Sequence, residues 1–242
     1  GRHLGVEEAG PGPAGRVDGA VEPGAGGDVR VGVHVDHPGG AGGIATHVDT
    51  QVPARADHPA LYSKRNGSWQ PMLWRAYPQQ TRRARRALIA LGVQPGEHVT
   101  IIGFNCAEWF IADIGAIAAG AIPAGIYTTN TPEQCQYIAE HCGARVAFVE
   151  NAEQLAKFRA VRDQLPALLA VVVMRGEPDG DDALSWARFL QLGDGVPDEQ
   201  LDARVAAQNA DDVCTLIYTS GTTCMPNAVM LTSAAFPSPP KN

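Results

Sequence analysis

From Tyr62 onward, hydrophobic and polar residues alternate in blocks that have two different periods. Short apolar runs predict buried strands, while apolar residues spaced three and four apart predict helices. The expected strands are residues 98–103, 122–127, 146–149, 167–174 and 213–218, and the expected helices are residues 79–91, 105–119, 131–141, 152–164, 184–192 and 199–207. Strands that take turns with helices predict an α/β fold with a mainly parallel sheet flanked by helices.

Residues 79–91 are the clearest predicted helix, with Pro78 close to its N1 position and Gly92 at its C′ position. One arc of this helix holds Ala84, Ala87, Leu88 and Leu91, and the opposite arc holds Arg82, Arg83, Arg85 and Arg86. The arginines could bind a phosphate-rich partner, but bases opposite an apolar arc are typical of a solvated helix face. We therefore predict a solvated face.

The boundaries of the next elements follow from capping residues. Asn105, with Glu108 three residues later, is predicted to cap a mostly apolar helix. The stretch 109–127 is long enough to suggest a membrane span, but its aspartate, proline and three glycines fit a buried helix followed by a buried strand better. Thr131 and Gln134, with proline at N1, predict a capping box.

The first 61 residues differ from the rest, because they hold fourteen of the 27 glycines and five of the seven histidines but no aromatic residue. Such a composition cannot supply a packed core, so we divide the chain into a disordered Gly-rich segment at 1–52 and a folded part at 53–242. A native segment and an out-of-frame translation of GC-rich DNA both account for it. His34 and His37 fit solvated side chains better than a metal site.

Charge and cysteine content narrow the class of protein. The net charge is −7, which makes nucleic acid an unsuitable main partner. The five cysteines include no C-x-x-C pair, so no metal site is predicted. Their odd number does not suit a disulfide framework, so a reducing compartment is expected. No secretory signal is visible, and we expect a protein that is intracellular, either cytoplasmic or peripheral to the cytoplasmic face of a membrane.

The residues that carry candidate chemistry follow the last predicted strand, in the order Tyr218-Thr219-Ser220-Gly221-Thr222-Thr223-Cys224-Met225-Pro226-Asn227-Ala228-Val229-Met230-Leu231. A glycine among hydroxylated residues lets backbone N–H groups and hydroxyls approach a polyphosphate. The stretch is not a Walker A sequence, because G-x-x-x-x-G-K-[ST] has no match. Runs of Ser, Thr and Gly are also common in ordinary turns, so composition alone leaves both interpretations open.

The order of these residues resembles the phosphate-binding signature of the AMP-forming acyl-CoA synthetases, the adenylate-forming superfamily. Upstream blocks are similar to the long-chain fatty acid ligases, nearest to the bubblegum-type branch. They are Ile102-Gly103-Phe104-Asn105, Glu108-Trp109-Phe110, Asp113-Ile114-Gly115-Ala116 and Gly125-Ile126-Tyr127-Thr128-Thr129-Asn130. The resemblance covers residues 53–232 and implies that the folded part is the N-terminal portion of the large domain.

The resemblance implies a two-step reaction. A fatty acid carboxylate attacks the α-phosphate of ATP to give an acyl adenylate and pyrophosphate, and coenzyme A then displaces AMP. Mg²⁺ and the loop residues would neutralise the developing charge. The expected phosphate-binding residues are Thr219, Ser220, Gly221, Thr222 and Thr223.

Two positions depart from the family pattern, since Cys224 replaces a glycine and Asn227 replaces a lysine, while Ala228 for glycine is a milder change. Losing one charge-assisted hydrogen bond costs roughly 1.5 to 3 kcal/mol. The family's adenine, ribose and catalytic-lysine segments have no counterpart, so we expect no catalytic residue in this chain and one side of the sheet uncovered. Two hypotheses follow: an incomplete ligase without full activity alone, or a degenerate relative that binds nucleotide or acyl groups.

Overall fold

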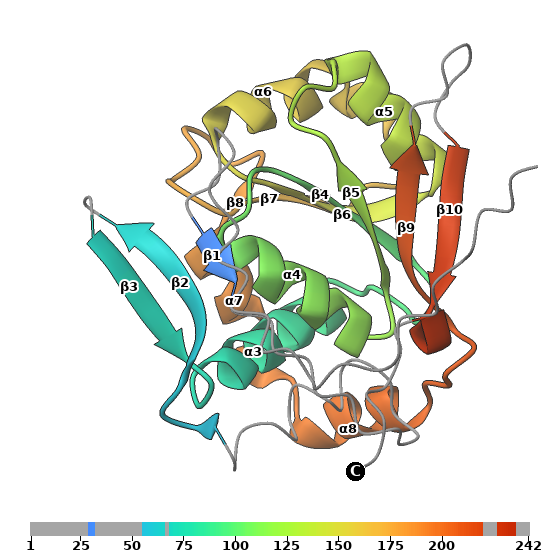
Figure 1. Ribbon diagram of the computed structural model, residues 1–242. Coiled ribbons are helices and arrows are strands. Elements are labelled where there is room, and N and C mark those ends of the chain that lie inside the picture. The colour runs from blue at the N-terminus through green and yellow to red at the C-terminus, as the bar shows by residue number, and fades with distance from the viewer. Residues whose placement is uncertain (1–28, 32–54, 66–67, 220–226, 236–242) are drawn as a thin grey trace, which may run out of the picture.

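The computed structural model describes residues 29–31, 55–65, 68–219 and 227–235, and its centre is a seven-stranded sheet with the order β10-β9-β5-β4-β6-β7-β8 (Figure 1). Strands β4 to β9 that are neighbours run parallel, and β10 pairs with β9 antiparallel. The prediction of a mainly parallel sheet is confirmed. The strands are β4 (His98–Ile102), β5 (Ile122–Ile126), β6 (Ala144–Val149), β7 (Ala170–Val173), β8 (Leu184–Ser185), β9 (Val213–Thr219) and β10 (Asn227–Thr232).

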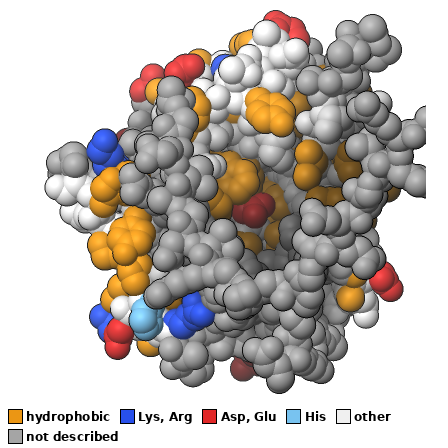
Figure 2. Space-filling model, viewed as in Figure 1, with side chains coloured by type: hydrophobic (Ala, Val, Ile, Leu, Met, Phe, Trp, Pro, Cys, Tyr) orange, Lys and Arg blue, Asp and Glu red, His pale blue; other side chains and the backbone are white. Residues whose placement is uncertain are grey.

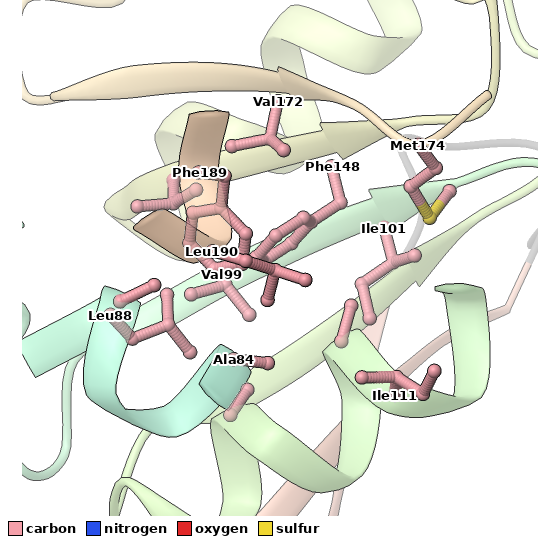
Figure 3. Close-up of a cluster of buried hydrophobic side chains, with 14 of the residues drawn as sticks. Ala84, Leu88, Val99, Ile101, Ile111, Phe148, Val172, Met174, Phe189 and Leu190 are labelled. Carbon is pink, nitrogen blue, oxygen red and sulfur yellow. The ribbon is translucent and has the colours of Figure 1, made fainter. Parts of the chain in front are cut away.

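Helices cover both faces of this sheet (Figure 1). The helices are α3 (Tyr77–Ala90), α4 (Ala107–Ala118), α5 (Pro132–His141), α6 (Ala152–Ala160), α7 (Trp186–Leu192) and α8 (Asp198–Ala206). One core joins α3, α4 and α7 to the sheet, and a second core joins α5 and α6 to its other face. Figure 3 shows the first core, where the rings of Phe148 on β6 and Phe189 on α7 meet edge to face at 5.2 Å.

A smaller antiparallel sheet, β1-β2-β3, was not predicted. It consists of β1 (Val29–Val31), β2 (Pro59–Arg65) and β3 (Ser68–Leu73). β3 is mostly solvated and carries Pro71. Its sequence therefore shows no regular alternation of apolar and polar residues from which a half-buried strand could be predicted. β1 lies inside the Gly-rich segment to which no structure was assigned, and it forms because β2 supplies a pairing partner. The other residues of 1–52 lie outside the described residues, and the division at residue 53 stays a prediction.

Local capping signals were read correctly at two helices. Gly92 has a φ of 88°, the left-handed conformation that favours glycine at C′, and Pro78 is in the first turn of α3. Thr131 forms the predicted capping box, because its hydroxyl accepts from the Gln134 N–H at 3.3 Å and the Gln134 side chain accepts from the Thr131 N–H at 2.9 Å.

Other boundaries were wrong. Cys106, in an extended conformation, is the N-cap of α4 in place of Asn105, and it makes no side-chain capping bond. The predicted helix 184–192 begins with the two-residue strand β8, because Leu184 and Ser185 pair with β7 before the Ser185 hydroxyl caps α7. The predicted helix 152–164 breaks at Val161 and continues as a 3-10 turn. The stretch 109–127 divides into α4 and β5 as expected, and none of the helices described is both long and apolar enough to span a bilayer.

The arginines of α3 do not form the solvated face that was predicted. Arg85 is 2% exposed, and Arg82 and Arg86 both bind Asp198 at the start of α8. Hydrogen bonds from Arg82 and Arg86 lower the pKa of the Asp198 carboxyl. The docking of α8 against α3 uses these charges, and it could not be read from the helix alone.

Arg204 of α8 and Gln208, which follows this helix, also cap a neighbouring helix. The Arg204 guanidinium donates hydrogen bonds to the carbonyl oxygens of Val93 at 2.9 Å and Ala119 at 3.0 Å. The Gln208 amide donates to the carbonyl oxygen of Ile117 at 2.9 Å. Ala119 and Ile117 lie at the C-terminal end of α4, where carbonyl groups lack helical partners, so these donors stabilise that end.

Candidate functional site

The candidate site lies at the edge of the sheet where the parallel strands end. Thr219 is the last residue of β9, and Asn227 is the first residue of β10 and its register partner. Both side chains are exposed. An exposed hydroxyl and an exposed amide on paired strand ends can hydrogen-bond to phosphate oxygens. The segment between them, residues 220–226 (the β9–β10 segment), therefore follows β9 at the edge where α/β sheets bind ligands.

The structure describes only part of the predicted phosphate-binding set. Of this set, Thr219 is placed as above, and Ser220, Gly221, Thr222 and Thr223 lie outside the described residues. Among the positions that depart from the family pattern, Cys224 also lies outside them, Asn227 begins β10, and Ala228 is opposite Tyr218 in the hairpin.

Sequence reasoning missed the side chains that hold β9 at this edge. The Tyr218 ring is 3% exposed, and its hydroxyl lies 2.9 Å from Nδ1 of His141, the last residue of α5. The two residues are 77 positions apart in the sequence, and no local pattern links them. Only the placement of α5 over β9 reveals the contact.

The turn that follows β5, residues 127–130, is held in place by a hydrogen bond from α6. Lys157 on α6 donates a hydrogen bond from Nζ to the carbonyl oxygen of Thr128 at 2.6 Å. Tyr127, which begins this turn, is 65% exposed. Because β5 is the parallel neighbour of β9, this turn and the end of β9 at Thr219 belong to adjacent strands.

Glu150 lies at the topological switch point of the sheet, where successive strands begin to be added on the other side of β4. β4 leads to β5 on one side and β6 leads to β7 on the other, so the crevice between β4 and β6 is where the fold would place a ligand. The Glu150 carboxylate, 6% exposed, accepts a hydrogen bond from the Phe104 N–H there at 2.8 Å. A Cβ at Gly103 would lie 2.7 Å from Glu150 Cβ. The crevice is thus packed, and the accessible chemistry lies two strands away at β9.

One half of the sheet exposes apolar side chains. Ile217 on β9 and Val229 on β10 are 44% and 46% exposed, and they are register partners in line with Gly125 of β5. Figure 2 shows hydrophobic side chains around a hollow on the viewed face, with an acidic side chain inside it.

Three buried cysteines of the described part of the chain are not activated as nucleophiles. Burial raises the pKa of Cys106 to about 12 and those of Cys135 and Cys142 to about 11, so these thiols stay protonated at neutral pH. Among the residues that the structure describes, no three His, Cys, Asp or Glu side chains are grouped so that they could hold a metal ion.

Comparison with known proteins agrees with this architecture. Residues 48–238 match the AMP-binding enzyme family. The chain is 46% identical over 177 residues to the long-chain-fatty-acid–CoA ligase ACSBG2 of Xenopus laevis, covering 72% of this chain and 24% of that protein. It is 42% identical over 174 residues to human long-chain-fatty-acid–CoA ligase ACSBG1, covering 71% of this chain and 24% of that protein. The chain thus spans about a quarter of the length of these relatives.

Solved structures show the same fold. The anthranilate CoA ligase AuaEII, in complex with anthranoyl-AMP, matches with a TM-score of 0.63 and 26% identity, covering 82% of this chain and 35% of that one. Acetoacetyl-CoA synthetase from Streptomyces lividans matches with a TM-score of 0.65 and 21% identity, covering 81% and 31%. The resemblance to acyl-CoA synthetases seen in the sequence is confirmed, and the chain belongs to the AMP-binding enzyme family.

Proposed function

We propose that this chain is the phosphate-binding part of an enzyme that activates a long-chain fatty acid with ATP and transfers the acyl group to coenzyme A. The carboxylate attacks the α-phosphate and releases pyrophosphate. The thiol of coenzyme A then attacks the acyl carbonyl of the adenylate, loses its proton and releases AMP. The support is the family, together with relatives of more than 40% identity that are long-chain-fatty-acid–CoA ligases.

The observation that carries the proposal is the position of the signature in the fold. The order Tyr-Thr-Ser-Gly-Thr-Thr begins at Tyr218, the last buried residue of β9, and the side chain of the next residue, Thr219, is exposed at the carboxyl edge. Hydroxyl and backbone donors held there by a sheet can stabilise charge that develops on a leaving pyrophosphate. We assign this binding role to Thr219, Ser220, Gly221, Thr222 and Thr223.

The described residues fit a nucleotide better than a resident metal. Thr219 and Asn227 offer neutral donors, and within the described ranges neither is accompanied by an acidic cluster. Mg²⁺ would therefore arrive with ATP, where it screens the phosphate charge. We also propose an intracellular location, cytoplasmic or at the cytoplasmic face of a membrane, which the four described cysteines support because all are free and buried.

A second candidate function is nucleotide or acyl binding without catalysis. Asn227 favours it, because the family's lysine would place a cation at the start of β10, directly across from Thr219. An amide cannot replace that charge, and we expect ATP binding to be weaker by roughly one to two powers of ten.

A chimaera separates the two candidates. Residues 53–232 of this chain replace the aligned segment of the Xenopus laevis ligase, either unchanged or with Cys224→Gly and Asn227→Lys. If the segment serves a ligase, the repaired chimaera will show palmitate-dependent exchange of pyrophosphate into ATP, and the unchanged one roughly 10- to 100-fold less. The unmodified ligase is the positive control. A soluble, folded repaired chimaera that binds ATP but shows no exchange would support the non-catalytic candidate.

A further inference from the structure

We infer that His141 is a positioning residue for Thr219, and that it acts by holding Tyr218 through a hydrogen bond. This inference rests on the proposed role of Thr219 and the β9–β10 segment in phosphate binding. It assigns a task in that site to a side chain from α5, on the opposite face of the sheet from the Thr219 side chain.

The backbone shows why the end of β9 needs such support. β5 pairs with β9 at two positions, Ala124 with Leu216 and Gly125 with Ile217. Beyond Ile217, the described ladder partners of β9 belong to β10 alone, where Ala228 faces Tyr218 and Asn227 faces Thr219. β10 is itself the outermost strand of the sheet in the described part of the chain. The last two residues of β9 therefore have ladder partners on one side only, and side-chain contacts add to the support that β10 gives them.

The contacts of Tyr218 supply that support. Its ring meets the His141 ring edge to face at 5.7 Å, and the hydroxyl lies 2.9 Å from Nδ1. His141 in turn packs against Tyr137 at 5.5 Å, and the Cys142 thiol also lies within hydrogen-bonding reach of the phenol. Burial raises the pKa of Tyr218, so its O–H stays protonated and can donate to Nδ1.

This geometry connects α5 to the site through the pleat of the strand. Successive side chains of a strand point to opposite faces, so fixing Tyr218 against α5 directs Thr219 toward the other face. α5 is itself fixed at its start by the Thr131 capping box. Loss of the His141 contact would let the end of β9 rotate and move the Thr219 hydroxyl, a change that a binding site tolerates poorly.

The experiment measures the Kd of MgATP for the complete chain by calorimetry, with variants at both ends of β9. Tyr218→Phe and His141→Phe remove the hydrogen bond and keep an aromatic ring, and each is expected to weaken MgATP binding about fivefold. His141→Asn places an amide oxygen near the position of Nδ1 and should recover most of the affinity. Thr215→Val is the matched control, since it removes a hydrogen bond of 3.2 Å to the Pro123 carbonyl at the other end of the strand.

The outcomes are distinct. Weaker binding in both aromatic variants, with unchanged Kd in Thr215→Val, supports the positioning role. Equal Kd values in all variants overturn it and leave the proposed function intact. An equal loss in Thr215→Val shows a general effect on stability and also overturns it. If the unchanged chain binds no MgATP, the proposed function fails and this inference falls with it.

Discussion

Asp113 provides a sharp test of the packing around α4, because its charge can be removed without changing its size. The residue lies on α4 among hydrophobic neighbours, and burial raises the pKa of its carboxyl to about 7. The described titratable groups that interact with it are Tyr77 of α3 and Cys214 of β9. Burial raises the pKa of both, so neither carries a charge near neutral pH.

The sign of the effect follows from proton binding. In an unfolded chain the Asp113 carboxyl has a pKa of about 3.9. The folded protein therefore holds this proton more tightly, and the associated stability is present below about pH 4 and is lost as the pH rises through 7. The difference between the two pKa values sets an upper limit of about 4 kcal/mol. Asp113 keeps some solvent exposure, so we expect about 2 kcal/mol after screening.

The perturbation is Asp113→Asn, and the assay is urea unfolding between pH 4 and pH 8. Asparagine is neutral throughout, so the variant should match the parent at pH 4 and exceed its free energy of unfolding by about 2 kcal/mol at pH 8. Asp194→Asn, at an exposed carboxylate, is the control and should show no such pH-dependent gain. An Asp113→Asn variant that parallels the parent at every pH would refute the reasoning.

Two further predictions concern stability and use thermal unfolding. Gly193→Ala would bring a Cβ to 2.6 Å from the backbone of α3, so Tm should fall by roughly 5 to 10 °C. Gly195→Ala is the control and should leave Tm nearly unchanged, because a Cβ at this position meets open space. Equal shifts in Tm would contradict the close approach of Gly193 to α3. Arg204→Met leaves the carbonyl oxygens of Val93 and Ala119 without this donor and should lower the free energy of unfolding by about 2 kcal/mol. Arg188→Met, at an exposed site, is the control and should lower it little. Similar losses in both variants would show that the cap on α4 contributes nothing to stability.

Features that depend on neighbouring residues could be predicted from the sequence. The boundaries of α3 and α5 follow from Pro78, Gly92 and Thr131, whose effects are local, and the buried strands of the large sheet follow from their apolar runs. The residues proposed to bind phosphate were identified from residue order and its resemblance to the family signature, and the position of Thr219 at the end of β9 follows from the predicted strand before it.

Features that depend on distant contacts could not be predicted. Arg82 and Arg86 form part of a helix surface that the sequence predicts to be solvated, but Asp198 of α8 binds both of them. β3 has too little apolar alternation to be recognised without its partner β2. The His141–Tyr218 hydrogen bond depends on the chain crossover that places the end of α5 against β9. The sequence of either segment alone does not reveal this placement.

The most direct test of the central claim is a calorimetric titration of MgATP into the unchanged chain and into the Cys224→Gly, Asn227→Lys double variant. If the β9–β10 segment binds the triphosphate and Cys224 and Asn227 weaken that binding, the double variant will bind MgATP roughly 10- to 100-fold more tightly than the unchanged chain. Equal affinities, or no binding by either protein, would contradict the claim.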